Sequence, residues 1–296
     1  MTRKSIRSLQ AVLCVIPVLV ILGLIRAYPI ADSIAKSFTS WDGLSPARWV
    51  GLNNYISLFH DKEFWVSFSN CLILLMHIPV KMLIALVFAL LLYEGVAGAK
   101  FFRSVMFFPQ VVSATIIGFL FSIVFSYDGP VNALLSFFRI TKEPIEWLGS
   151  RGTGLMVIIF CLIWQGIGYQ ALLLTGGITS IPESLFEAAK LEGANYWQRL
   201  FNIVIPMVIR VLEFLLITNV AWVFTGIFPY VFSVSRGGPG YMTSTIDYMI
   251  YTKAFVQGND YGIPCAISVI MLILVLAFAA IQTMVTDKAD DWSGSV

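Results

Sequence analysis

Six long apolar stretches constrain the fold of this chain more than any other feature of its sequence. They cover Leu9 to Tyr28, Val66 to Leu92, Val105 to Phe125, Leu155 to Thr175, Val204 to Phe228 and Pro264 to Met284. A helix needs about 20 apolar residues to cross a bilayer core about 30 Å thick, and only helices and closed barrels satisfy every backbone group there. The stretches are apolar on all sides and lack the alternation of barrel strands. We therefore predict an all-α membrane helix bundle, a single transmembrane domain over residues 1–296 with six spans.

The composition agrees with a membrane solvent and excludes several other classes. Hydrophobic residues make up 58% of the chain and charged residues 12%, whereas soluble domains have about 45–50% and about 25%. The net charge of +2 gives no basic surface for nucleic acid. The four cysteines show no metal-binding spacing and lie in or beside apolar stretches, so we expect packing residues and neither disulfides nor a metal site. They are Cys14, Cys71, Cys161 and Cys265.

The basic residues at the start of the chain set its expected orientation. Arg3, Lys4 and Arg7 precede the first apolar stretch, and such clusters stay in the cytoplasm. The stretch is followed by Arg26-Ala27-Tyr28-Pro29 instead of a small-residue cleavage site, which favours a retained helix over a signal peptide. With an even number of spans, we expect both termini to be cytoplasmic.

A polar segment at residues 181–203 separates the fourth and fifth spans. Pro182 suits the first turn of a helix, and the acidic Glu183 and Glu187 suit the positive end of its dipole. Gly193 is a natural stop because it adopts the left-handed conformation without a side-chain clash. We predict a short surface helix after Pro182 and a second one from Tyr196 that leads into the fifth span. The first is too short to be stable alone, so something should pack on it.

The same segment carries a pattern that resembles a known family. The pattern is Glu187-Ala188-Ala189, then Gly193, then Ile203 and Pro206. It is similar to the E-A-A loop of the membrane subunits, or permeases, of bacterial ABC importers. In that family the loop is a coupling helix that sits in a groove of the ATP-hydrolysing subunit, and the resemblance implies this ATPase-coupling role for the six residues. The alternative is an ordinary interfacial helix that lies on lipid headgroups.

Shorter motifs resemble the sugar importers within this family, of the maltose and glycerol-phosphate type. They include Gly51-Leu52-Asn53-Asn54-Tyr55, Phe108-Pro109 and Gly237-Gly238-Pro239-Gly240. The resemblance implies a multi-pass subunit of the bacterial inner membrane, with lipid around it and a carbohydrate as its substrate. It also implies three kinds of partner, namely a second homologous permease, two ATP-binding subunits and an extracytoplasmic solute-binding protein. The last outer loop, with residues 237–240, is the candidate docking site for the binding protein; a plain hairpin connection is equally consistent.

The sequence shows no motif that is typical of an enzyme active site. The chain contains no Gly-Lys dipeptide and hence no phosphate-binding loop, and its two histidines form no metalloprotease motif. We therefore expect a non-catalytic transport subunit that binds no cofactor directly. ATP and Mg²⁺ would be bound by the partner ATPase.

Two polar stripes on the fourth and fifth spans are candidates for the substrate pathway, in the spans that line the sugar site in the family. They consist of Leu162, Gln165, Gly166 and Tyr169 on one span and Asn219, Trp222, Val223 and Gly226 on the other. Amide groups suit sugar hydroxyls, aromatic rings suit the C–H face, and the glycines leave room. Small and aromatic residues also simply pack membrane helices, and both interpretations stay open.

Charged residues within the spans pose a further question because a buried charge is costly in a bilayer. Asn70, His77 and Lys81 share a stripe of the second span. This stripe indicates either a path for an anionic solute or, as we favour, an internal ion pair or a contact with the partner permease. Arg210 and Glu213, three residues apart, should pair locally.

The alternative function is an ion-coupled secondary transporter of a small polar solute. Lys81, His77 and Glu213 would then be the relay groups. Inverted repeats and broken mid-membrane helices would support this alternative, and the sequence shows no such symmetry.

Overall fold

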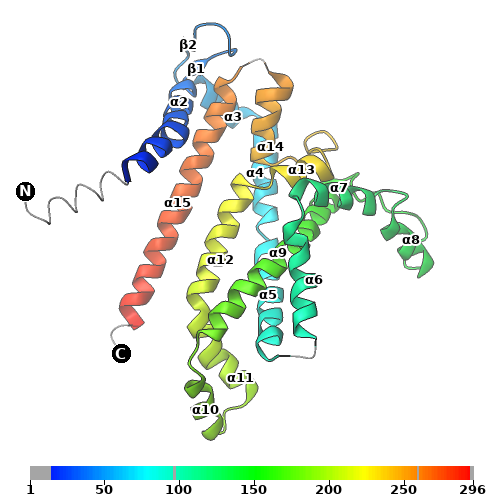
Figure 1. The fold of residues 1–296 in the computed structure, drawn as a ribbon. Coiled ribbons are helices and arrows are strands. Elements are labelled where there is room, and N and C mark those ends of the chain that lie inside the picture. Colours follow the sequence, from blue (N-terminus) through cyan, green and yellow to red (C-terminus); the bar gives the residue numbers. More distant parts are fainter. Residues whose placement is uncertain (1–14, 96–97, 259, 294–296) are drawn as a thin grey trace, which may run out of the picture. The chain divides into compact units, whose positions relative to one another are not determined.

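The structure is a computed structural model that describes residues 15–95, 98–258 and 260–293. Arg3, Lys4, Arg7 and the beginning of the first predicted span lie outside these residues. The chain divides into two compact units, residues 1–61 with 249–277 and residues 62–248 with 278–296. Figure 1 shows the helices of both units.

The predicted membrane helix bundle is confirmed. Five continuous stretches of the described chain are long and apolar enough to cross a bilayer, and a bent helix pair brings the number to six when it counts as one span. The five are Val15–Lys36, Lys62–Tyr93, Arg151–Thr179, Tyr196–Thr225 and Gly262–Ile281. The bent pair is Ala99–Val111 with Ala114–Val124.

The first unit contains short helices, a small hairpin and the beginning of the last long helix. Its elements are η1 (Gly23–Ala27), α2 (Tyr28–Lys36), β1 (Thr39–Ser40), β2 (Arg48–Trp49), α3 (Asn53–His60), η3 (Thr252–Gln257) and α15 (Gly262–Ser293); α14 (Ile246–Tyr251) precedes η3. The strands β1 and β2 are antiparallel, with Thr39 opposite Trp49. Buried Asn54 donates hydrogen bonds to the carbonyls of Ser37 and Thr39. Its amide therefore fixes the turn after α2, where backbone groups would otherwise lack partners.

The second unit is built around one long central helix. Its elements are α4 (Lys62–Leu74), α5 (His77–Tyr93), α6 (Ala99–Val111), α7 (Ala114–Val124), α8 (Pro130–Phe137), α9 (Arg151–Thr179), α10 (Glu183–Leu191), α11 (Tyr196–Arg199), η2 (Leu200–Val204), α12 (Ile205–Thr225) and α13 (Phe228–Val234). Helices α5, α6 and α12 all pack against α9, and α13 packs against α7. Ser150 caps α9 by accepting a hydrogen bond from the Thr153 N–H, which satisfies one free donor at the helix start.

The predicted span at residues 105–125 is not one straight helix, and this part of the prediction is corrected. Helices α6 and α7 meet at a bend of 98°, because Val112 (ψ 140°) and Ser113 (ψ 136°) are extended. Pro109 lies just before the bend, and it supplies no N–H to the helix. The carbonyl of Val112 instead accepts a hydrogen bond from the Gln165 side chain of α9, at 3.1 Å. The central helix α9 therefore satisfies a backbone carbonyl that the bend leaves without a helical hydrogen bond.

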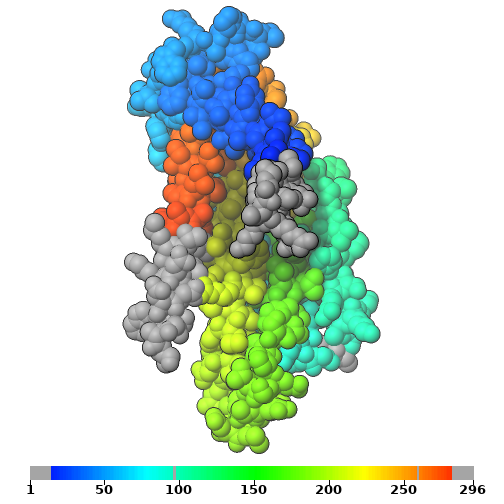
Figure 2. All heavy atoms as spheres, turned by 60° about the vertical axis from the view of Figure 1, so that its left-hand side comes forward, coloured from blue at the N-terminus to red at the C-terminus, as the bar shows by residue number. Residues whose placement is uncertain are grey.

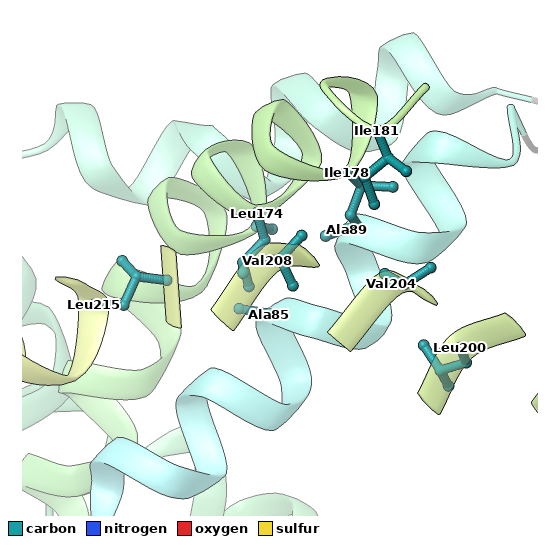
Figure 3. Packing of buried hydrophobic residues seen from close by; sticks show 10 residues of the cluster. Ala85, Ala89, Leu174, Ile178, Ile181, Leu200, Val204, Val208 and Leu215 are labelled. Atoms are coloured by element: carbon teal, nitrogen blue, oxygen red, sulfur yellow. The ribbon is translucent and has the colours of Figure 1, made fainter. Parts of the chain in front are cut away.

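A tightly packed apolar cluster joins α5, α9 and the start of α12 (Figure 3). Its buried members are Ala85, Ala89, Ala171, Leu174, Ile178, Ile181, Leu200, Val204, Val208 and Leu215. The alanines let the helix backbones approach closely, as is usual in membrane bundles. Phe186 of α10 also packs against this cluster. The surface helix is thereby attached to the bundle core.

We expect Gly168→Ala to destabilise the second unit strongly. A Cβ at Gly168 would lie 2.0 Å from the Met106 carbonyl oxygen and 2.9 Å from the Phe107 Cα, so α6 and α9 would have to separate. Overpacking of this kind costs about 1–3 kcal/mol. Thermal unfolding of the detergent-purified protein measures the effect.

Gly176→Ala is the matched control for this prediction. Gly176 lies in the same helix, and a Cβ there would meet nothing within 4 Å. Alanine is favoured over glycine inside a helix by about 0.8–1.0 kcal/mol, so this variant should keep or raise the unfolding temperature. Equal unfolding temperatures for the two variants would contradict the close crossing of α6 and α9.

Candidate functional site

A polar cavity of about 300 Å³ lies in the second unit, with its walls formed mainly by α9 and α12 and with one residue each from α5, α6 and α13. Six of the eight residues predicted for the substrate pathway line it, namely Leu162, Gln165, Gly166, Tyr169, Asn219 and Trp222. The two stripes predicted on separate spans thus face one common space. That they carry a substrate stays a prediction.

The other two predicted pathway residues do not line the polar cavity. Val223 is fully buried and belongs to the packing of α12. Gly226 ends α12, and a Cβ there would lie 2.5 Å from the Trp222 ring. Its missing side chain therefore leaves room for the Trp222 indole, which itself lines the cavity.

Six further residues line the polar cavity beside the predicted ones. They are Lys81, Gln110, Gln170, Leu215, Thr218 and Tyr230. Lys81 is recognisable from the sequence as an intramembrane charge, but its distance along the chain from the other spans gives no sign that it lies beside them. For the other five, the residue type alone carries no signal, because their position depends on how α6, α12 and α13 pack on α9.

Gln165 uses both ends of its amide within the protein. Its NH₂ group donates to the Val112 carbonyl at the bend between α6 and α7. Its carbonyl oxygen accepts a hydrogen bond from the Tyr230 hydroxyl of α13. Gln165 therefore holds three elements together, and its polar atoms already have partners.

Both polar atoms of the Asn219 side chain also form hydrogen bonds, whereas only one of the two polar atoms of the Gln170 side chain does. The Asn219 carbonyl oxygen accepts from Gln170 Nε2 at 3.0 Å, and its NH₂ group donates to the Leu215 carbonyl. The Oε1 atom of Gln170 is buried and has no hydrogen-bond partner in the part of the chain that the structure describes. A buried unpaired acceptor is costly, so Gln170 is the less well satisfied of the two amides.

The aromatic side chains of the cavity are accessible. Trp222 is 51% exposed and Tyr169 is 43% exposed, so each ring offers an apolar face. Trp164 of α9 does not line the cavity; its ring lies 5.7 Å from that of Phe121. Trp164 therefore belongs to the packing of α9 against α7.

Lys81 is buried at the cavity wall, with 5% of its surface exposed. His77 Nδ1 donates to the Leu74 carbonyl, so its Nε2 accepts from Lys81 Nζ at 3.2 Å. Within the described ranges no carboxylate lies close enough to form an ion pair with Lys81. The internal ion pair, one of the two interpretations favoured from the sequence, is therefore absent there, and a contact of Lys81 with the partner permease stays a prediction.

Asn70 has a different role from the two other residues of its stripe. It donates to the carbonyls of Met242 and Ser244 and accepts from Arg151 Nε. Asn70 thus ties α4 to the start of α9 and to the loop before α14. The local pair predicted between Arg210 and Glu213 is confirmed, with an N–O distance of 3.6 Å.

The segment predicted to contact an ATPase forms the expected pair of short helices. Helix α10 covers Glu183–Leu191, and Gly193 follows it with φ +79°. Asn195 and Gln198 form a capping box at the start of α11, which satisfies two free N–H groups. The local predictions for this segment are confirmed.

Helix α10 protrudes from its unit and is held by one aromatic side chain. Phe186 packs on the apolar cluster, with its ring 6.0 Å from that of Tyr93. The segment projects at the bottom of Figure 2. Ala188 is exposed, as are Leu185 and Leu191, the latter to 91%. That this exposed side of α10 contacts an ATPase stays a prediction.

The predicted coupling residues occupy two places. Glu187, Ala188 and Ala189 are in α10. Ile203 and Pro206 lie at the junction of η2 and α12, where Ile203 packs against the apolar cluster. The π-helical turn of η2 directly precedes Pro206, whose ring excludes a regular hydrogen bond to residue 202. These two residues position the entry into α12.

The Gly-Gly-Pro-Gly loop is a compact turn. Gly237 and Gly240 have φ values of +73° and +62°, and the Thr243 hydroxyl donates to the Gly238 carbonyl at 2.8 Å. Pro239 and Gly240 are exposed. The loop lies near the ends of α9 and α12 that are opposite α10 (Figure 1). Its role in docking the solute-binding protein stays a prediction.

Comparisons with known proteins identify relatives over most of the chain. Residues 81–290 match the family described as binding-protein-dependent transport system inner membrane component. The probable ABC transporter permease protein YurN of Bacillus subtilis is 32% identical over 91% of this chain and 93% of its own length. The sn-glycerol-3-phosphate transport system permease protein UgpA of Escherichia coli O157:H7 is 31% identical over 91% of each chain.

Solved structures share the fold. A bacterial ABC transporter involved in the import of the acidic polysaccharide alginate superimposes with a TM-score of 0.80, at 21% identity, over 95% of this chain and 96% of that one. A bacterial alginate ABC transporter in complex with an alginate pentasaccharide-bound periplasmic protein gives a TM-score of 0.83 over 97% of both chains. These likenesses bear on the fold alone.

Proposed function

This chain belongs to the family of binding-protein-dependent transport system inner membrane components, and we propose that it is one permease of an ATP-driven importer of a carbohydrate or carbohydrate derivative. The observation that carries the proposal is the polar cavity, with its accessible Tyr169 and Trp222 rings, in the same compact unit as the protruding helix α10. The similarity to the glycerol-3-phosphate permease supports a polyhydroxylated solute.

The energy would come from other chains. This sequence has no phosphate-binding loop, so two partner subunits would bind ATP and Mg²⁺, and this chain would bind no cofactor itself. A second homologous permease would complete the pathway. Both termini and α10 would then lie on the cytoplasmic side, and the loop with residues 237–240 would receive the solute-binding protein outside.

Helix α10 would transmit the motion of the ATPases. Phe186 attaches it to the apolar cluster, which also contains residues of α5, α9 and α12. The helices that line the cavity and the helix that meets the ATPase thus share one core. Closure of the ATPases on ATP would move this core as a body and change the side from which the cavity is open.

The test is to reconstitute the complete importer in liposomes and to measure ATP hydrolysis and uptake with its binding protein and a panel of carbohydrates. We expect one carbohydrate to stimulate both activities, and uptake to continue after ionophores collapse the ion gradients. The opposite result would establish a secondary transporter. In that case no ATPase would co-purify with this chain, and uptake would stop when the ion gradients collapse even though ATP is present.

A further inference from the structure

We propose that the imported carbohydrate carries an anionic group, a carboxylate or a phosphate, and that Lys81 binds it in the polar cavity. The inference rests on the proposed function and assigns a substrate class to the same site. It starts from an imbalance of charge. Among the described residues that line the cavity, Lys81 is the only charged one.

The position of Lys81 is specific to the cavity. A Cβ at Gly166 would lie 3.0 Å from Lys81 Cδ and 3.1 Å from its Nζ, so the missing side chain of Gly166 makes room for the ammonium beside α9. Only one Lys81 partner is found in the described part of the chain, the neutral His77 Nε2. An ammonium group has three N–H donors, and two of them are left for a ligand.

A buried lysine without a carboxylate partner is energetically unfavourable inside a membrane. A buried cation in a span is costly and normally pairs with an acid inside the bundle. Here His77 Nε2 accepts a hydrogen bond from Lys81 but supplies no negative charge, because the ring is neutral, with its proton on Nδ1 bonded to the Leu74 carbonyl. An anionic solute would supply the missing charge. Charge-assisted hydrogen bonds are about twice as strong as neutral ones.

A second unpaired group lies in the same wall. Gln170 Oε1 is buried and accepts no hydrogen bond from the described residues. An acceptor of this kind suits a hydroxyl donor, while the Lys81 ammonium suits an acceptor with negative charge. An acid or phosphate ester compensates the charge of Lys81, whereas a neutral sugar leaves it uncompensated.

The experiment uses the complete importer in liposomes, with its binding protein and matched pairs of radiolabelled solutes. The pairs are glucuronate with glucose, trigalacturonate with its methyl ester, and sn-glycerol 3-phosphate with glycerol; maltose is added as a further neutral sugar. Wild type, Lys81→Gln and Lys81→Arg are compared. Lys100→Gln removes an exposed lysine from α6 and is the control for the loss of one positive charge.

We expect the wild-type importer to take up an anionic member of the panel at least about tenfold faster than its neutral partner. Lys81→Gln should lower that uptake by about tenfold or more, which corresponds to the loss of one hydrogen bond to a charged group. Lys81→Arg should retain more uptake than Lys81→Gln, and Lys100→Gln should retain all of it.

Two results would overturn the inference and leave the proposed function intact. One is a wild-type importer that takes up only neutral sugars, or both members of each pair equally. The other is a Lys81→Gln variant that imports the anionic solute at the wild-type rate. If this variant does not assemble, the comparison of solutes in the wild type decides alone. Absence of any carbohydrate uptake would contradict the proposed function itself.

Discussion

Replacing Ala188 by glutamate is expected to abolish solute-stimulated ATP hydrolysis in the complete importer. Ala188 lies on the exposed side of α10, near the exposed apolar Leu185 and Leu191. If α10 contacts the ATPase as proposed, a carboxylate at this position would be buried in that interface, and burial of an unpaired charge costs free energy. A central interface residue contributes about 2–4 kcal/mol, so binding of the ATPase should weaken by about 30- to 1000-fold.

Co-purification of the ATPase with the affinity-tagged permease measures this effect directly. Ala133→Glu is the matched control, because Ala133 is an exposed alanine in another short helix, α8. It introduces the same side chain and should leave co-purification unchanged. An Ala188→Glu complex that retains its ATPase and its stimulated activity would show that α10 is not the coupling element and would favour the interfacial-helix alternative.

The elements that could be predicted from the sequence are those set by local chemistry. The apolar stretches determine the spans, Gly193 ends α10 through its positive φ, and the prolines mark helix starts. The bend at Val112 and Ser113 could not be found in this way. It depends on Gln165, which lies 53 residues further along the chain and donates to the exposed carbonyl.

The polar cavity shows the same limit. Helical spacing correctly brought Tyr169 and Trp222 toward one space, because residues on one stripe share a face. It could not show which polar atoms have partners. The Gln165 amide forms hydrogen bonds with the Val112 carbonyl at the bend and with the Tyr230 hydroxyl. Gln170, which is not part of the predicted pathway, has the unpaired oxygen. Hydrogen-bond partners across helices are a tertiary property.

Lys81 is the clearest case of a residue whose sequence interpretation changed. A charge within a span normally indicates a pair inside the bundle, and the sequence favours such a pair or a contact with the partner permease. The structure gives Lys81 a neutral histidine and a place in the cavity wall. The space that admits it is the missing side chain of Gly166 on another span, which no pattern along the second span could indicate.

Replacing Tyr169 and Trp222 by alanine is expected to abolish uptake while the complex still assembles. Both rings line the polar cavity and are about half exposed, so their removal leaves no large hole in the packed core. Each ring offers a large apolar face to the C–H groups of a sugar. Each single substitution should lower uptake by about tenfold or more, and the double substitution by about 100-fold if the two losses of free energy add.

The matched control is Trp164→Ala, which removes an equally large ring from the same helix as Tyr169. Trp164 contacts Phe121 and does not line the cavity, so this variant should keep its uptake even if its unfolding temperature falls. Uptake from the loaded binding protein and co-purification of the partner subunits are measured for all variants. If Trp164→Ala lowers uptake as much as Trp222→Ala does, the two rings act through helix packing. Only a loss of uptake that is confined to the Tyr169 and Trp222 variants would place the solute in the polar cavity.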